Sequence, residues 1–487
     1  MIAFQKHPVK TFFAILLSSI LSFMAIAQPQ NSLDTQIEAL IQNTLPNASI
    51  GILLQDAKSG KVLYERRSQE AFPPASTTKL FTAAAALLAL KPDYQYKTVV
   101  AIAPGTLQNG TLQGNLYVQF SGDPTLTTTD LTQLIKDLKA SGLARIQGNI
   151  ILDASRFSGA AYGLGISADS MNWYFSAPIT SVILNENKAK IILNSNKALG
   201  DTVEVALTPD EPLKLVLEQD LVTVTESDAQ NKCQIQIDMN PENVLAIKGC
   251  WPQNKEPSVL QVAVKNPTLI AKKIILETLK SENIRFDGTL EVKWSARNPK
   301  TLNIPKDLTV LATHASKPLA VLLGPLLLDS NNIYAQSITK TLGYQQYQTG
   351  TFQAGVLAMQ EILEPMGVDF SKLKILEGSG ESRYNLVPPR QLGQLLFAVY
   401  QDKTINADFM QNLPIFGESG TLKRRELEAI KGKVLAKTGS LNGVSTLAGY
   451  LKSASENEMI LVIMIDHLLD KDKVRDFENN LLKLLVE

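Results

Sequence analysis

The chain has 487 residues, and its 47 Lys and Arg residues are balanced by 47 Asp and Glu residues. Proteins that bind nucleic acid usually show a basic excess or stripe, so this balance argues against a nucleic-acid partner. A hydrophobic content of 45% is ordinary for a globular protein with a core, and the length predicts more than one domain.

The N-terminus predicts export. A short basic region precedes an apolar run at residues 11–24, and small residues at positions 25 and 27 then form a cleavage signal. This order is typical of a secretory signal peptide, predicted here as residues 1–27, and it would place the mature protein in the periplasm. The alternative is an uncleaved N-terminal anchor.

Two kinds of pattern follow in chain order. The first part predicts a helix at 36–45, strands at 49–54 and 61–65, and a long Ala- and Leu-rich helix at 76–90. From residue 94 short β-rich runs alternate with turns, at 98–103, 116–121, 148–153 and from about 179 to 248, with helices at 131–141 and 270–282. We interpret this middle region as inserted β-rich domains.

Helices dominate from residue 308, and strands return near the end. The predicted helices are 319–328, 332–342, 351–366 and 389–400, and the predicted strands are 433–437, 445–452 and 459–466. Helices that cover a sheet formed from both chain ends make an α/β sandwich. The last helix, 471–485, is amphipathic, so we expect it to pack on the core, with at most a peripheral membrane contact as the alternative.

The two cysteines flank a predicted hairpin. Cys233 precedes a strand-like run at 234–238, Cys250 follows another at 244–248, and a turn lies between the runs. A hairpin would bring its outer ends together, and an exported compartment permits a disulfide. We favour the disulfide over two reduced, buried thiols.

Histidine is too scarce to suggest a metal enzyme. Apart from the signal peptide the chain has only His314 and His467, and no His-x-x-x-His or Cys-x-x-Cys spacing occurs. A zinc site is therefore not expected, and hydrolytic chemistry would need a base other than histidine.

The first candidate for chemistry is Ser76-Thr77-Thr78-Lys79, at the start of the long predicted helix. Residues three apart on a helix share a face, so Ser76 and Lys79 should meet. A neutral lysine can accept the serine proton, and the helix N-terminus favours developing negative charge. The spacing alone is weak, because Ser-x-x-Lys is expected roughly twice by chance in such a chain. The alternative is an N-cap serine beside a solvated lysine.

The second candidate is Ser330-Asn331-Asn332, between two predicted helices. A serine hydroxyl can relay a proton, and an asparagine amide can hold a substrate carbonyl. Taken alone, the motif is better explained as an ordinary helix N-cap.

The third candidate is Lys437-Thr438-Gly439-Ser440, at the end of a predicted strand. Lys437 offers a fixed positive charge for a carboxylate. Gly439 lets a substrate backbone lie against the strand, and the following N–H can serve an oxyanion hole. The alternative is a strand end with a turn glycine.

Together the three motifs occur in the order known for β-lactamases and penicillin-binding proteins. The chain resembles the class C low-molecular-mass penicillin-binding proteins, which are D-Ala-D-Ala carboxypeptidases and endopeptidases of family S13, over nearly the whole mature chain. In that family a long insertion separates the first two motifs. Here roughly 250 residues, more than a typical domain, separate Ser76 from Ser330.

Other segments carry the same resemblance. They are Gly122-Asp123-Pro124-Thr125-Leu126, Asn185-Glu186-Asn187, Gly378-Ser379-Gly380 with Ser382-Arg383-Tyr384-Asn385, and Leu413-Pro414 with Gly420-Thr421-Leu422. The chain departs from the family at Glu377, where aspartate is usual, and at Glu381, where leucine is usual. Asn331 also replaces an aspartate, which the family tolerates. The change at Glu381 can alter substrate preference but removes no catalytic group.

The resemblance implies an α/β fold with a penicillin-binding, serine β-lactamase-like transpeptidase domain of helices packed on an antiparallel sheet. Two β-rich inserted domains interrupt it. The predicted borders are 28–95 plus 297–487 for the catalytic domain, 96–165 plus 256–296 for inserted domain II, and 166–255 for inserted domain III.

The resemblance also implies an acyl-enzyme mechanism. Ser76 would be the nucleophile, Lys79 its general base, and Ser330 the relay that protonates the leaving amine. The backbone N–H groups of Ser76 and Ser440 would form the oxyanion hole. The substrates would be peptidoglycan stem peptides, β-lactams would acylate Ser76, and neither a metal nor another cofactor is needed.

Substrate binding is assigned by resemblance as well. Asn332 would bind the substrate amide, and Lys437, with Thr438 and Ser440 beside Gly439, would hold the terminal carboxylate. Family members also use an aspartate of an inserted domain to contact the diaminopimelate side chain. Asp153, at the end of a predicted strand, is the candidate, and its alternative is a turn former at the strand end.

Two other classes of function stay open. The large insertion and the Gly-Asp-Pro element argue against a β-lactamase or esterase on the same scaffold. The intact catalytic serines and lysines argue against a catalytically silent peptidoglycan-binding protein.

Overall fold

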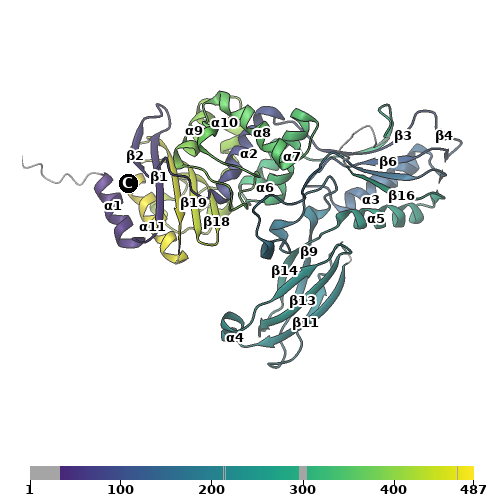
Figure 1. Ribbon diagram of the computed structural model, residues 1–487, viewed down its shortest axis with the longest axis horizontal. Helices are drawn as coiled ribbons and strands as arrows, with labels where there is room; N and C mark the ends of the chain where they lie inside the picture. The colour runs from purple at the N-terminus through teal and green to yellow at the C-terminus, as the bar shows by residue number, and fades with distance from the viewer. Residues whose placement is uncertain (1–32, 212, 214, 295–303, 469) are drawn as a thin grey trace, which may run out of the picture.

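The computed structural model describes residues 33–487 apart from 212, 214, 295–303 and 469. The predicted signal peptide and the predicted domain border at 296 lie outside the described residues. Figure 1 shows a body that contains the C-terminus and the first described helix, with a first lobe extending to the right and a second lobe below. The borders predicted for domains II and III stay predictions.

The body is built on an antiparallel sheet that joins both ends of the described chain. Its order is β18 (Val434–Leu441), β19 (Val444–Lys452), β20 (Glu458–Asp466), β1 (Ser49–Asp56) and β2 (Val62–Arg66). In the pairing of β1 with β20, Ile52 lies opposite Ile463. The long-range sheet that the sequence predicted is therefore present.

Helices cover both faces of this sheet. On one face Ile52 and Ile463 pack with residues of α1 (Leu33–Thr44) and α11 (Lys471–Val486). On the other face Leu53 and Val462 pack against helices that include α2 (Lys79–Ala89) and α9 (Pro389–Gln401). Successive strand residues point to opposite faces, so one run of apolar residues fills two cores. The remaining helices of the body are α6 (Leu319–Leu327), α7 (Asn332–Tyr347), α8 (Phe352–Leu363) and α10 (Asn406–Met410).

The first lobe pairs a sheet with two helices. The sheet order is β16 (Leu290–Trp294), β8 (Ile150–Ala154), β6 (Leu116–Gln119), β3 (Lys97–Ile102) and β17 (Thr309–Ala315). The helices α3 (Thr128–Lys136) and α5 (Pro267–Ser281) share its core. A small second sheet contains β15 (Arg285–Phe286), β7 (Arg145–Ile146), β5 (Thr111–Leu112) and β4 (Leu107–Gln108).

The second lobe is mostly strands and contains the disulfide. Its sheets are β10 (Glu204–Leu207), β9 (Lys188–Asn194) and β14 (Ser258–Ala263), and β11 (Val216–Val224), β13 (Val244–Pro252) and β12 (Gln236–Met239). The strands β12 and β13 form the predicted hairpin, and Cys233 and Cys250 are bonded with their Cα atoms 6.0 Å apart. The predicted disulfide is thus confirmed. The sequence missed α4 (Glu226–Asn231), because five polar residues and one alanine show no helical periodicity.

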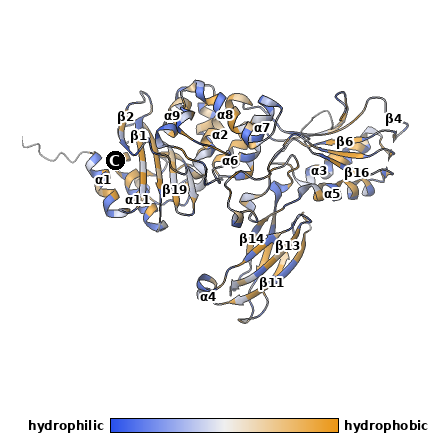
Figure 2. Ribbon diagram, in the orientation of Figure 1, coloured by the Kyte–Doolittle hydropathy of each residue, from blue (hydrophilic) through white to orange (hydrophobic). Residues whose placement is uncertain are grey.

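Hydropathy follows this architecture. Figure 2 shows hydrophobic residues along the strands of the body and of both lobes. The helix α2 is buried all round, as expected for an Ala- and Leu-rich helix in the middle of a core. None of the helices in the described ranges is both long and apolar enough to cross a membrane.

Candidate active site

The first motif opens α2 through a tight turn. Residues Ala75–Thr78 form a 3₁₀ turn before α2 begins at Lys79, so the predicted helix at 76–90 starts later than expected. The Thr77 and Thr78 hydroxyls donate to the carbonyl oxygens of Pro74 and Ala75, at 2.6 and 2.9 Å. Hydroxyls that bond nearby carbonyls compete with the regular helical pattern, which accounts for the tighter turn. Ser76 sits half-buried on this turn.

Lys79 is placed to act on the Ser76 hydroxyl. The ammonium nitrogen, Nζ, lies 2.9 Å from Ser76 Oγ, 2.6 Å from Asn332 Oδ1 and 2.6 Å from the Ser379 carbonyl oxygen. The side chain is fully buried. Burial lowers the pKa of Lys79 to about 8, although the nearby carboxyl groups of Glu377 and Glu381 act in the opposite direction. A neutral amine is therefore accessible at mildly alkaline pH.

The second and third motifs meet at another buried lysine. Lys437 Nζ donates to Ser330 Oγ and to the Thr438 carbonyl oxygen, both at 2.8 Å. Burial, followed by the neighbouring charge of Lys79, lowers the pKa of Lys437 well below its ordinary value. The strand β18 runs through Gly439 and Ser440 to Leu441, so this motif lies within a strand rather than at its end.

Backbone conformation marks Ser330 and Ala75 as unusual. Their φ angles are 59° and 46°, in the left-handed region that side chains with a Cβ rarely adopt. Such strain persists only where surrounding contacts enforce it, and it clusters at functional sites. Asn331 is the N-cap of α7, and its side chain accepts from the Ile333 amide at 2.9 Å. The cap thus holds the loop between Ser330 and Asn332.

Glycines let two segments approach the Ser76 turn. A Cβ on Gly439 would lie 2.2 Å from Thr446 Oγ1 and 2.8 Å from the Ser76 amide nitrogen. A Cβ on Gly380 would lie 1.7 Å from the Ala75 carbonyl oxygen. Only residues without a side chain fit at these two positions, so β18 and the 377–385 loop close directly on the turn.

A buried carboxylate organises the 377–385 loop. Glu377 is fully buried, and it accepts from the backbone amides of Ser379, Gly380 and Ser382 at 2.7, 2.8 and 3.1 Å. These bonds satisfy the carboxylate and orient the Ser379 carbonyl toward Lys79. Glu377 therefore holds the 377–385 loop in shape, a role that the sequence did not reveal.

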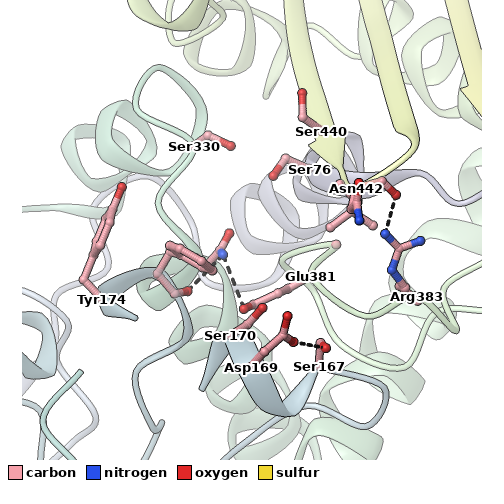
Figure 3. Close-up of a pocket in the computed structure, with 14 residues that line it drawn as sticks. Ser76, Ser167, Asp169, Ser170, Tyr174, Ser330, Glu381, Arg383, Ser440 and Asn442 are labelled. Carbon is pink, nitrogen blue, oxygen red and sulfur yellow. Dashed lines mark hydrogen bonds between the residues drawn. The ribbon is translucent and has the colours of Figure 1, made fainter. Parts of the chain in front are cut away.

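The motifs border a common pocket of about 420 Å³ (Figure 3). Ser76, Ser330, Asn332 and Ser440 line it. In the view of Figure 3 the hydroxyls of Ser76, Ser330 and Ser440 lie on one side of the pocket, with Asp169 on the other. Further lining residues that the motif search did not assign a role are Asp169, Ser170, Tyr174, Phe175, Arg383 and Asn442. Among the residues described here, no group of three or more His, Cys, Asp and Glu is placed to hold a metal ion.

Residues 33–487 match the model of the D-Ala-D-Ala carboxypeptidase 3 (S13) family. The chain belongs to this family. It is 31% identical to the D-alanyl-D-alanine carboxypeptidase DacB of Haemophilus influenzae over 88% of each chain. It is 30% identical to the D-alanyl-D-alanine carboxypeptidase of Actinomadura sp. (strain R39), over 85% of this chain and 77% of that one. The family predicted from the motifs is confirmed.

A solved structure supports the same assignment. The crystal structure of penicillin binding protein 4 from Haemophilus influenzae matches with a TM-score of 0.83 and 30% identity, over 93% of this chain and 99% of that one. The same protein complexed with a β-lactam matches with a TM-score of 0.79 and 29% identity, again over 93% and 99%. The predicted penicillin-binding α/β fold is confirmed.

The substrate-binding candidates are not all brought together. Thr438 and Gly439 lie on β18 beside Ser440, and Thr438 Oγ1 donates to Thr421 Oγ1 at 2.7 Å. Asp153 is absent from the pocket of Ser76. It lies near the end of β8, where its Oδ1 accepts from the Ser155 amide at 3.0 Å and the Ser155 hydroxyl at 2.6 Å in a turn that follows the strand. The substrate role of Asp153 stays a prediction, whereas the turn itself is formed.

The departure from the S13 pattern at Glu381 lies close to Lys79 and Asn332. Glu381 Oε2 accepts from Asn332 Nδ2 and from Gln336 Nε2, each at 3.3 Å. Burial raises the pKa of Glu381 to about 8, reinforced by Glu377 and opposed by Lys79. The sequence located this departure but could not show that its carboxyl group reaches the amide of Asn332.

Proposed function

We propose that this chain is a serine peptidase that cleaves D-Ala-D-Ala termini, D-alanyl cross-links, or both, in peptidoglycan, and that β-lactams inhibit it. The observation that carries the proposal is the 2.9 Å contact between Lys79 Nζ and Ser76 Oγ inside a family known for this reaction. A serine nucleophile needs an adjacent base, and a buried lysine with a lowered pKa supplies one.

The acylation step follows from the contacts. Ser76 Oγ attacks the carbonyl carbon of the penultimate D-alanine while neutral Lys79 takes its proton. The developing oxyanion is bound by the Ser76 and Ser440 amides, and Gly439 allows the strand that carries Ser440 to approach. Ser330, held by Lys437, relays to the leaving amine the proton that Lys79 took from Ser76, and the C–N bond breaks. Water then hydrolyses the ester and restores the Ser76 hydroxyl.

Substrate contacts divide between the strand and the loops. The terminal carboxylate binds near Lys437, Thr438 and Ser440, because these groups offer a positive charge and two hydroxyls on one strand. Asn332 holds Lys79 through Oδ1 and donates to the Phe175 carbonyl at 3.0 Å through Nδ2. Its role in binding the substrate amide therefore requires that Nδ2 exchange partners when a peptide enters.

An aspartate of the inserted region is present in the pocket, but it is Asp169. Asp169 lines the pocket together with Arg383, so the two side chains offer opposite charges to one ligand. The free end of a diaminopimelate side chain carries both an amino and a carboxylate group. We therefore assign this contact to Asp169 in preference to Asp153.

The proposed location is the periplasm, where peptidoglycan is accessible.

The test is intact-protein mass spectrometry of the mature protein with benzylpenicillin, comparing wild type with Ser76→Ala. A stable adduct of one penicillin, lost in the variant, is the expected result, and digestion of muropeptides would then separate carboxypeptidase from endopeptidase activity. Absence of an adduct with penicillin intact would favour the silent binding protein. Rapid penicillin hydrolysis would favour a β-lactamase.

A further inference from the structure

The side chain of Glu381 borders the active-site pocket, at a position where the resemblance to the S13 pattern leads us to expect leucine. Glu381 lines the same pocket as Ser76, and Figure 3 shows it between Ser76 and Asp169. Leucine cannot ionise or accept a hydrogen bond, so this chain carries a titratable group that the shared mechanism does not use.

A chain of hydrogen bonds joins this carboxyl group to the nucleophile. Glu381 Oε2 accepts from Asn332 Nδ2 at 3.3 Å, and Asn332 Oδ1 accepts from Lys79 Nζ at 2.6 Å. Lys79 Nζ in turn lies 2.9 Å from Ser76 Oγ. Because the Nδ2 end of Asn332 faces Glu381, its carbonyl end is aimed at Lys79. One side chain thus separates the carboxyl group from the base.

Burial makes the ionised form of Glu381 unfavourable unless Lys79 is also charged. Oε1 of Glu381 is buried with no hydrogen-bond partner among the described residues, so an ionised carboxylate would carry an unsatisfied oxygen. The ammonium form of Lys79 favours the carboxylate, and the carboxylate favours the ammonium form in return. The protons on the two groups are therefore coupled.

Several other charged or titratable groups lie near Glu381. Glu377, on the same loop, opposes its ionisation. Tyr162, from the inserted region, has its pKa raised to about 12, by burial first and by Glu381 second, so it stays neutral. Asp169 and Arg383 line the pocket, and the Arg383 guanidinium donates to the Asn442 carbonyl. Burial first, and the charge of Lys79 second, lower the pKa of Lys437. Within the described part of the chain, Lys79 is the cation whose charge lowers the pKa of Glu381.

We propose that Glu381 sets the pH at which Lys79 becomes a neutral base, by holding Lys79 as an ammonium ion until a more alkaline pH than an uncharged side chain would. This inference rests on the proposed function, and it makes Glu381 a positioning residue that acts through Lys79. When Lys79 loses its proton beside an ionised Glu381, a buried anion is left without its cation. The Glu381 carboxylate therefore raises the pH at which Lys79 loses that proton. Acylation of Ser76 requires neutral Lys79, so it also needs the higher pH.

The test is the pH profile of Ser76 acylation. Second-order rate constants for a chromogenic β-lactam would be measured from pH 5.5 to 9.5 for wild type, Glu381→Gln and Glu381→Leu. We expect the rising limb of both variants to move to lower pH by about one unit, the effect of removing one nearby opposite charge. On that limb the variants would then acylate about tenfold faster than wild type at the same pH.

Controls separate this inference from the proposed function and from misfolding. Glu256→Gln removes an exposed carboxylate in the inserted region, and it should leave the limb in place. Glu381→Gln preserves the shape of the side chain, so it carries the test if the leucine variant unfolds. An unchanged limb, or a shift to higher pH, would overturn the inference while wild-type acylation still supports the function. A normal limb with slowed hydrolysis of the acyl-enzyme would also overturn it, by assigning Glu381 to deacylation. If wild type forms no adduct, the proposed function itself fails.

Discussion

The approach of β18 to the Ser76 turn predicts a severe effect of Gly439→Ala. The new Cβ would lie 2.2 Å from Thr446 Oγ1, about 1.2 Å inside ordinary van der Waals contact. Thr446 cannot turn away without cost, because its hydroxyl donates to the buried Pro74 carbonyl at 2.9 Å. The strand must therefore move away from the turn, and overpacking of this kind costs about 1–3 kcal/mol of stability.

The effect on acylation should exceed the effect on stability. The same Cβ would lie 2.8 Å from the Ser76 amide nitrogen, which is a proposed oxyanion donor. Loss of one such donor costs about 10²–10³-fold in rate. We expect Gly439→Ala to lower the acylation rate by about that factor, measured by stopped-flow kinetics with a chromogenic β-lactam on protein shown to be folded by circular dichroism.

A matched substitution provides the control. Gly324 lies in α6, and a Cβ there would approach only Asn412 Oδ1, at 3.6 Å. Gly324→Ala should keep the wild-type acylation rate and gain about 0.5–1 kcal/mol of helix stability. If folded Gly439→Ala acylates at the wild-type rate, the strand does not need to approach Ser76 as closely as we argue, and the assignment of the oxyanion donors is refuted.

Three further predictions concern parts of the molecule outside the Ser76–Lys79 contact. Lys340 is buried, and its Nζ donates to three backbone carbonyl oxygens of residues 158–179 at 2.8 to 3.3 Å. Lys340→Met should therefore lower the free energy of unfolding, measured in urea, by about 2–4 kcal/mol. An unchanged urea midpoint would contradict this. The disulfide closes a sequence separation of 17, so Cys233→Ser should cost about 3 kcal/mol in the second lobe but leave penicillin labelling intact, as thermal unfolding and mass spectrometry would show. Asp169→Asn should reduce kcat/KM for muropeptides about tenfold, or 1.4 kcal/mol, without slowing penicillin acylation, whereas Asp153→Asn should have little effect; the reverse ranking would restore the original assignment.

Much of the fold could be predicted from short-range patterns. Strands were predicted near both chain ends, with helices covering the sheet that they form together, and β1 indeed pairs with β20. The helix boundaries were less accurate. The predicted helix at 351–366 ends as α8 at Leu363, and Pro365 occupies the 3₁₀ turn that follows. Proline removes an amide donor and disrupts the regular pattern.

The candidate site was partly predictable for the same reason. Ser76 and Lys79 are three residues apart, so local geometry alone places them together, and the structure has their side chains 2.9 Å apart. The contact between Ser330 and Lys437 spans 107 residues, and only the resemblance to a known family suggested it beforehand.

The sequence by itself therefore determined the family, the α/β class, the local spacing of the serine and lysine, and the hairpin that brings the cysteines together. Each of these depends on residues close in the chain, or on motifs whose order can be compared directly. Only the tertiary structure decided that Asp169 rather than Asp153 enters the pocket, and that Glu381 reaches Lys79 through Asn332. These outcomes depend on how loops that are hundreds of residues apart pack together. A buried polar group there needs a hydrogen-bond partner, and the local sequence pattern does not show which residue supplies it.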